Sequence, residues 1–236
     1  MLAFLTKAGY CLMIIATFLE CSSKIERGRP VIEKQANIAE NTDNDMENTE
    51  AAGQVKLAAS FIEKASSLEV EYKVRNATNN PIYIFNVVLD TDQIETLSPF
   101  KFYSCLREDG TIVLAKAIPK LPSLASVEVR DIPFATKVEA GSEFAEKVEV
   151  PLPLEEYSPY FQKDFNSKVE ERVSEKIYLV VQFIREQEGL EVKETKIPNA
   201  VKVYHRELIA KAETLKSDKR PIEVRVNRRL DTFERF

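Results

Sequence analysis

Apolar and charged side chains alternate from Leu68 to Arg75 in this chain of 236 residues. Leu68, Val70, Tyr72 and Val74 are each followed by a glutamate, a lysine or an arginine. Successive side chains of a β-strand point to opposite faces, so this segment can bury one face and expose the other to solvent. The alternation therefore predicts a half-buried strand.

Short apolar runs of the same kind recur along the chain at a spacing of roughly ten residues, with turn residues between them. They cover residues 82–89, 102–107, 111–115, 126–130, 144–150, 177–185, 190–197, 201–204 and 222–226. Gly110 suits the left-handed position of a hairpin between the runs at 102–107 and 111–115, and residues 186–189 are predicted to join 177–185 to 190–197 in another hairpin. The last two runs are expected to be edge strands. Helix is expected only at 165–176 and 207–215.

This pattern predicts an all-β fold, namely an antiparallel β-sandwich with elaborated loops and at most short helices. The β-rich body spans residues 55–236, which is long for one immunoglobulin-like module of about 100 residues. Residues 151–176 are rich in proline and charge and form the one plausible seam. We expect a single elaborated domain rather than a sandwich with an added C-terminal layer.

The first 21 residues predict an export signal. Lys7 is followed by an uncharged run from Ala8 to Leu19, which fits the apolar region of a signal peptide and is shorter than a membrane-spanning helix. Residues 22–54 are polar and poor in aromatic and aliphatic side chains, so we expect them to form a disordered tether.

The segment Phe18-Leu19-Glu20-Cys21 resembles the lipobox of a bacterial lipoprotein signal peptide. In that family the cysteine becomes the first mature residue and carries the lipid, which implies lipidation of Cys21. Glu20 departs from the pattern, because the family has a small residue there. Cleavage after Ser22 and Ser23 without a lipid, an uncleaved anchor and a chance apolar start are the alternatives.

Residues Leu68–Asn76, followed by Pro81-Ile82-Tyr83-Ile84, resemble the early strands of bacterial immunoglobulin-like domains. The resemblance implies an immunoglobulin-like arrangement of the sandwich. It implies no function, since sandwiches carry many unrelated activities.

Composition excludes several classes of function. The chain has one histidine, so a multi-histidine metal site cannot be built. Phosphate-binding loops, Cys-x-x-Cys pairs and nucleophile elbows are absent from the sequence. A net charge of −5 argues against nucleic acid as a partner. We therefore expect no metal, no cofactor and no catalysis, and we expect Cys105 to be a buried, inert thiol.

Two segments are candidate binding sites. Tyr157, Tyr160 and Phe161 follow a proline-rich stretch and could contact a protein partner. Arg225, Arg228 and Arg229 could form a basic edge that attracts an acidic partner or anionic lipid, or that merely protects an edge strand from unwanted pairing.

Two further motifs carry alternatives. Glu155, Glu156 and Asp164 could supply the paired carboxylates of a glycan-active enzyme. Asn76-Ala77-Thr78 has the spacing of a glycosylation acceptor, which would matter only in a eukaryotic source.

These observations together predict an exported, lipid-anchored, non-catalytic protein of the cell envelope that binds a protein or an envelope component. It would face the periplasm or the cell surface and contact the membrane through its N-terminal lipid. The alternatives are a secreted protein, a carboxylate-dependent glycan-active enzyme and a structural subunit of an envelope assembly.

Overall fold

The computed structural model describes residues 54–90, 96–98, 100–121, 131–160 and 168–230. All of them belong to one compact unit, Thr42–Phe236. The expectations for the export signal, Cys21, the tether, the run at 126–130, Phe161 and Asp164 lie outside the described residues.

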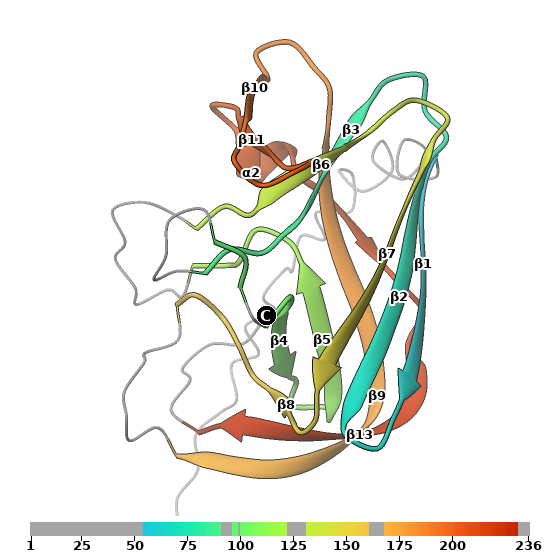
Figure 1. The fold of residues 1–236 in the computed structure, drawn as a ribbon, viewed down its shortest axis with the longest axis vertical. Helices are drawn as coiled ribbons and strands as arrows, with labels where there is room; N and C mark the ends of the chain where they lie inside the picture. The colour runs from blue at the N-terminus through green and yellow to red at the C-terminus, as the bar shows by residue number, and fades with distance from the viewer. Residues whose placement is uncertain (1–53, 91–95, 99, 122–130, 161–167, 231–236) are drawn as a thin grey trace, which may run out of the picture. The chain divides into compact units, whose positions relative to one another are not determined.

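A small antiparallel sheet forms one layer of the molecule (Figure 1). It contains β1 (Val55–Glu63), β2 (Ser67–Asn76) and β7 (Glu143–Pro151), with β2 in the middle. The alternating segment that predicted a strand is β2, and its register places Val74 opposite Leu57 of β1 and Phe144 of β7.

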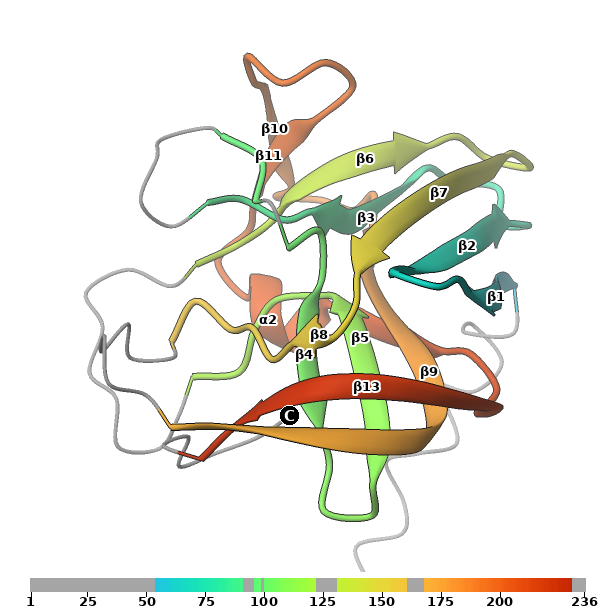
Figure 2. The same cartoon turned by 60° about the horizontal axis from the view of Figure 1, so that its bottom comes forward.

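A large mixed sheet forms the second layer (Figure 2). Its strands are β3 (Ile82–Val87), β4 (Tyr103–Leu106), β5 (Thr111–Lys116), β6 (Phe134–Val138), β8 (Leu154–Glu155), β9 (Val169–Arg185), β10 (Glu191–Glu194), β11 (Val201–Tyr204), β12 (Glu213–Lys216) and β13 (Arg220–Arg229). The main path runs β10-β11-β6-β3-β9-β13-β8, while β5 and β12 pair with β9 and β4 pairs with β5. The pairs β5–β9 and β8–β13 are parallel, so the sheet is not purely antiparallel as expected.

Strand β9 is the central strand of the large sheet, because other strands pair along both of its edges. β13 and then β12 pair along one edge, and β5 and then β3 pair along the other. The helix expected at 165–176 is wrong from Val169 onward, where the chain is already strand. The charged residues there suit a helix by local propensity, but pairing with β13 decides the conformation.

The hairpin expected between 177–185 and 190–197 is also wrong. β10 pairs with β11 instead of β9. The end of β9 offers no free edge, since Phe183 already faces β3 on one side and β12 on the other. β11 in turn lies between β10 and β6, so it is not the edge strand that was expected. The hairpin of β4 and β5 is confirmed, and Gly110 has the left-handed φ of 74°.

The main core lies between the two sheets. Leu68, Val70, Tyr72 and Val74 are all buried and belong to the same apolar cluster as Ile177 and other inward residues of β9. A second cluster on the far face of the large sheet includes Tyr83, Phe85, Ile184, Val203 and Leu208.

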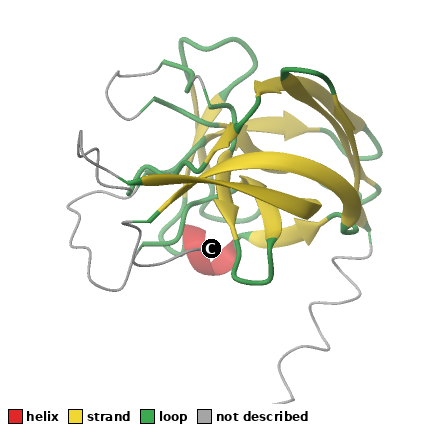
Figure 3. Ribbon diagram, turned by 90° about the horizontal axis from the view of Figure 1, so that it is seen from below, coloured by secondary structure: helices red, strands yellow, loops and turns green. Residues whose placement is uncertain are grey.

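The all-β sandwich is confirmed, and Figure 3 shows strands dominating both layers. The single helix of the described residues is α2 (Leu208–Lys211), which lies within the region where a short helix was expected. It is far too short to cross a membrane, and the described ranges contain no other helix to consider. The immunoglobulin-like strand order stays a prediction.

Candidate functional site

The aromatic segment that follows β8 packs against the end of the sandwich. The ring of Tyr157 stacks on Phe100 at a centroid distance of 4.2 Å and on Tyr103 at 5.8 Å. The Tyr160 hydroxyl accepts the backbone N–H of Asp131 at 3.1 Å. Both tyrosines are half-buried, so much of their surface is engaged within the protein.

The two neighbouring glutamates of this region bind separate structural partners. Both carboxylate oxygens of buried Glu156 accept backbone N–H groups, from Leu106 and from Arg229, each at 2.7 Å. Exposed Glu155 accepts the side-chain amide of Asn227 at 2.6 Å. Glu156 therefore joins β4 to the end of β13, which is a structural task that leaves neither of its oxygens free of a hydrogen bond.

The basic residues of β13 lie along β9. Arg225 is exposed, while Arg228 and Arg229 are half-buried. Arg228 stands directly opposite Glu170 in the register, which places a carboxylate beside this part of the basic edge. Beyond its two-residue pairing with β8, the second edge of β13 has no strand partner among the described residues.

A cleft of about 540 Å³ beside β7 is a stronger candidate site than the segments described so far. One wall consists of six consecutive residues of β7, Phe144–Glu149. The facing wall is made by Asn86, Val87, Val88, Leu97, Ser98, Lys101, Lys116, Thr136, Ile197, Pro198 and Asn199. These consecutive residues belong to both faces of β7, so it is the edge of the strand that borders the cleft.

That edge of β7 is open. β7 pairs with β2 on one side, and within the described part of the chain no strand pairs on its other side. In an antiparallel strand every second residue directs its N–H and C=O groups to one side. The cleft is therefore bordered by a row of backbone donors and acceptors that can pair with another extended segment.

A buried lysine lies at the base of the cleft. Lys116 is only 3% exposed, and its Nζ donates to the backbone oxygen of Asn86 at 2.8 Å. The same Nζ lies 3.3 Å from Oε2 of Glu146 on β7 and 4.8 Å from the centre of the Phe102 ring. The hydroxyl of Tyr72 donates to Oε2 of Glu146. Glu146 thus ties the open strand to both β2 and β5.

The electrostatics of this cluster follow from its burial. Burial lowers the pKa of Lys116 from its ordinary value of 10.5, and the opposite charge of Glu146 counteracts that shift. The pKa of Tyr72 is raised well above its ordinary value, first by burial and then by the charge of Glu146. Tyr72 is consequently a neutral hydrogen-bond donor over the whole physiological pH range.

Three further features of the cleft walls are out of the ordinary. The side-chain oxygen of buried Asn86 has no hydrogen-bond partner within the described residues. Lys101 and Asn199 both have left-handed φ angles, of 63° and 61°. This region is unfavourable for lysine, whereas asparagine adopts it more readily, and residues in strained conformations concentrate at functional sites.

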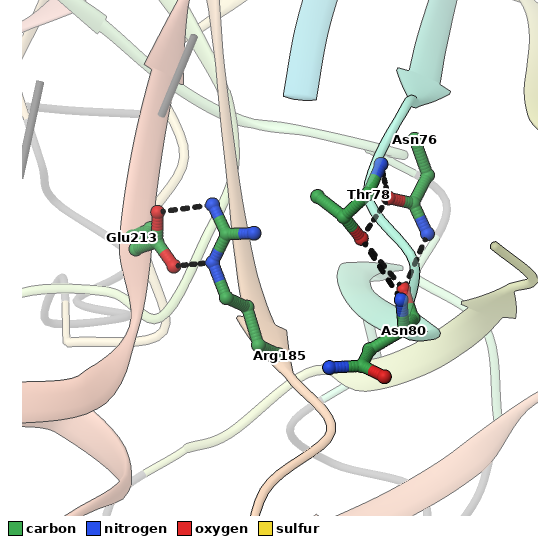
Figure 4. Close-up of polar contacts among 5 residues, drawn as sticks. All are labelled: Asn76, Thr78, Asn80, Arg185 and Glu213. Carbon is green, nitrogen blue, oxygen red and sulfur yellow. Dashed lines mark hydrogen bonds and ion pairs between the residues drawn. The ribbon is translucent and has the colours of Figure 1, made fainter. Parts of the chain in front are cut away.

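An asparagine at the adjoining corner holds the walls in place. The side-chain nitrogen of buried Asn76 donates to the backbone oxygens of Asn80, Val138 and Glu139, at 2.9, 3.1 and 3.1 Å. Its oxygen accepts the backbone N–H of Thr78 at 3.1 Å (Figure 4). These bonds join the turn between β2 and β3 to the turn between β6 and β7. A glycan on this nitrogen would break them, so Asn76 is not a glycosylation acceptor in this fold.

A second polar contact holds the large sheet beside this corner. Arg185 at the end of β9 binds Glu213 of β12 through two hydrogen bonds, of 2.6 and 3.0 Å (Figure 4). The pair is partly buried, and its fork geometry fixes the orientation of both strands.

Two other hollows are less distinctive. An open hollow of about 920 Å³ lies between α2 and the β10–β11 hairpin, and it is lined in part by His205 and Tyr204. A small apolar pocket of about 170 Å³ is lined by Phe100, Phe102 and Leu154 among others. Within the described residues no group of three or more histidine, cysteine or acidic side chains could hold a metal ion.

The cleft was missed when the sequence was read alone. One signal for it exists, because Lys116 occupies the position that continues the inward-facing series Ile112 and Leu114. Burying a lysine at an inward position of an otherwise apolar strand costs free energy unless the ammonium group has a partner. Such a lysine is therefore a candidate for a functional site. Comparison of the chain with protein-family models, curated proteins and solved structures found no match.

Proposed function

We propose that this chain is an exported, lipid-anchored and non-catalytic protein of the cell envelope that binds an extended segment of a partner protein along the open edge of β7. The observation that carries the binding proposal is that this edge borders the 540 Å³ cleft for six consecutive residues. The export and lipid anchor rest on the apolar run before Cys21.

Strand addition is the mode of binding that this cleft suits best. A segment laid along β7 would satisfy the backbone groups of the open edge, and its alternate side chains would enter the cleft. Leu97 offers apolar contact on the facing wall, where it is 47% exposed. Backbone pairing supplies affinity, and the few side chains in the cleft supply selectivity.

The polar groups at the base favour binding over catalysis. Glu146 and Lys116 are held by one another, and Glu146 is also held by Tyr72. A general base or a nucleophile needs a reacting atom within hydrogen-bond reach, whereas here the groups are engaged in fixing β7 against the large sheet. This arrangement supports a rigid docking edge.

Hydrogen exchange tests the binding proposal. The probe is a blocked peptide of alternating threonine and valine, about as long as β7, added to the full-length protein. We expect the amides of 143–151 to exchange more slowly with the peptide present, because open-edge groups become hydrogen-bonded. The amides of 55–63 in β1 serve as an internal control, since β1 is the other outer strand of the same sheet.

A matched pair of cysteine variants gives an independent readout. Lys147→Cys lies on β7 and Lys56→Cys on β1, and both lysines are exposed. A peptide with one central cysteine should form a disulfide with the first variant and not with the second. Unchanged exchange in 143–151, or equal trapping by both variants, would refute strand addition at β7.

The lipid anchor has its own test. Cells that express the protein are labelled with a palmitate analogue and fractionated. The wild-type protein should carry label and sediment with membranes, whereas Cys21→Ala should do neither. A Cys21→Ala protein that is labelled and membrane-bound to the same extent would remove the lipid from the proposal.

A further inference from the structure

Among the residues that the structure describes, the lining of the cleft carries more positive than negative charge. Three of these lining residues are lysines, Lys101, Lys116 and Lys147, and two are glutamates, Glu146 and Glu149. Two of these five charges, those of Lys147 and Glu149, already form ion pairs with residues that do not line the cleft.

The paired charges belong to the outer face of β7. Lys147 binds Glu69 at 2.6 Å, and Glu149 lies 3.4 Å from Lys64. Neither partner, Glu69 nor Lys64, lines the cleft. Of the described lining residues, Lys101, Lys116 and Glu146 therefore set the electrostatic balance inside the cleft.

Within this set, one carboxylate faces two ammonium groups. Glu146 is the ion-pair partner of Lys116. Lys101 is exposed and has no ion pair to any described residue. Its charge acts on Lys116, where it adds to the effect of burial in lowering the pKa. The two lysines thus repel each other, and an entering anion would relieve that repulsion.

We propose that the segment bound along β7 is acidic, and that one of its aspartate or glutamate side chains enters the cleft beside Lys101 and the Lys116–Glu146 pair. This inference rests on the strand-binding function proposed above. The protein as a whole carries a net charge of −5, so a local positive charge such as that of Lys101 is needed to attract an acidic segment to this edge.

The left-handed backbone of Lys101 supports this assignment. Its φ of 63° costs conformational energy for a side chain of this type, and the conformation places the residue on the cleft wall. Ser98 supports the turn, since its backbone oxygen accepts the N–H of Lys101 at 3.3 Å. The ammonium group of Lys101 is thus presented from a short, hydrogen-bonded turn.

Three peptides test the charge preference. Each is the alternating threonine–valine peptide with one central valine replaced, by glutamate, by glutamine or by lysine. We expect the glutamate peptide to bind up to about fivefold more tightly than the glutamine peptide at low salt, which is the upper end of the range for one exposed charge pair. The lysine peptide should bind most weakly.

Two protein variants assign the preference to the cleft. Lys101→Gln removes the charge and keeps a side chain of similar length, so the glutamate and glutamine peptides should then bind with nearly equal affinity. Lys56→Gln is the matched control, because it removes an exposed lysine from the opposite strand of the small sheet. It should leave the preference unchanged.

The outcomes separate this inference from the function it rests on. If all three peptides slow exchange in 143–151 with equal affinity, the acidic preference is wrong and strand binding stands. If the lysine peptide binds best, or if both variants weaken the preference equally, the role of Lys101 is overturned. If no peptide slows exchange in 143–151, strand binding itself is refuted.

Discussion

Replacing Asn76 should destabilise the fold more than any other single change of a polar side chain in the β2–β3 turn. The residue is fully buried, and its amide nitrogen reaches three backbone oxygens while its oxygen accepts from Thr78. The nitrogen carries two hydrogens, so two of those three contacts can be well-formed hydrogen bonds at one time. Asn76→Ala would leave their acceptors without a donor.

The magnitude follows from the number of bonds. Each buried hydrogen bond contributes on the order of 1 kcal/mol, and leaving a buried partner unsatisfied costs about 1–3 kcal/mol. With two bonds given and two accepted, from the N–H and the hydroxyl of Thr78, we expect Asn76→Ala to lower the free energy of unfolding by about 2–4 kcal/mol. Asn76→Asp should cost at least as much, because it turns a donor into a charged acceptor that faces carbonyl oxygens.

Urea unfolding followed by tyrosine fluorescence and far-ultraviolet circular dichroism measures this loss. Asn79→Ala is the matched control, since Asn79 lies in the same turn and is exposed. Its effect should stay within about 0.5 kcal/mol. A loss for Asn76→Ala that equals the loss for Asn79→Ala would show that the corner does not depend on these bonds.

Three other substitutions separate structural from functional roles. Glu156→Gln should lower the free energy of unfolding by about 1–3 kcal/mol, measured in urea, because one backbone N–H loses its acceptor; an unchanged stability would contradict this role. Arg185→Lys should cost about 1 kcal/mol by losing the two-bond fork to Glu213, and thermal unfolding that matches the wild type would argue against it. Lys116→Met should change the pH dependence of stability, because the pKa of Lys116 is lowered in the fold. The folded state then releases this proton before the unfolded state does, so the wild type should gain stability relative to the variant as pH rises toward 10.5. A difference between the two proteins that is flat with pH would refute the shift.

Local patterns were sufficient for much of the fold. The alternation from Leu68 to Val74 is a property of one segment, and it predicts β2 because period-two burial belongs to strands. Gly110 likewise predicts its hairpin, since a left-handed φ at a tight turn is a local requirement. Both features depend on neighbours within a few residues.

The errors arose where distant segments decide the outcome. The first half of β9 has the composition of a helix, and it is a strand because β13, about fifty residues later in the chain, pairs with it. The hairpin expected around Gly189 failed for the same reason, since β3 and β12 already occupy the end of β9. Pairing partners of this kind cannot be inferred from one segment.

The cleft could not be assembled from sequence because its parts come from separate strands. Lys116 and Glu146 are thirty residues apart, and only the stacking of β5 beneath β7 brings them together. The conspicuous aromatic residues drew attention to Tyr157 instead, which the structure places in a stack at the end of the core.

The ion pair of Lys116 and Glu146 also affects which segments can bind the open edge of β7. Exposed strand edges invite pairing with any extended chain, and natural proteins prevent this with charges that point inward or outward along the edge. Glu146 is such an inward-pointing charge, and Lys116 makes its burial tolerable. An apolar segment laid on β7 would cover the exposed part of Glu146 and gain no bond to it, so its binding would be penalised by the desolvation of that carboxylate. A segment with a carboxylate next to Lys101 would offset part of that penalty. The charges of the cleft would then both discourage unspecific strand pairing and select an acidic partner.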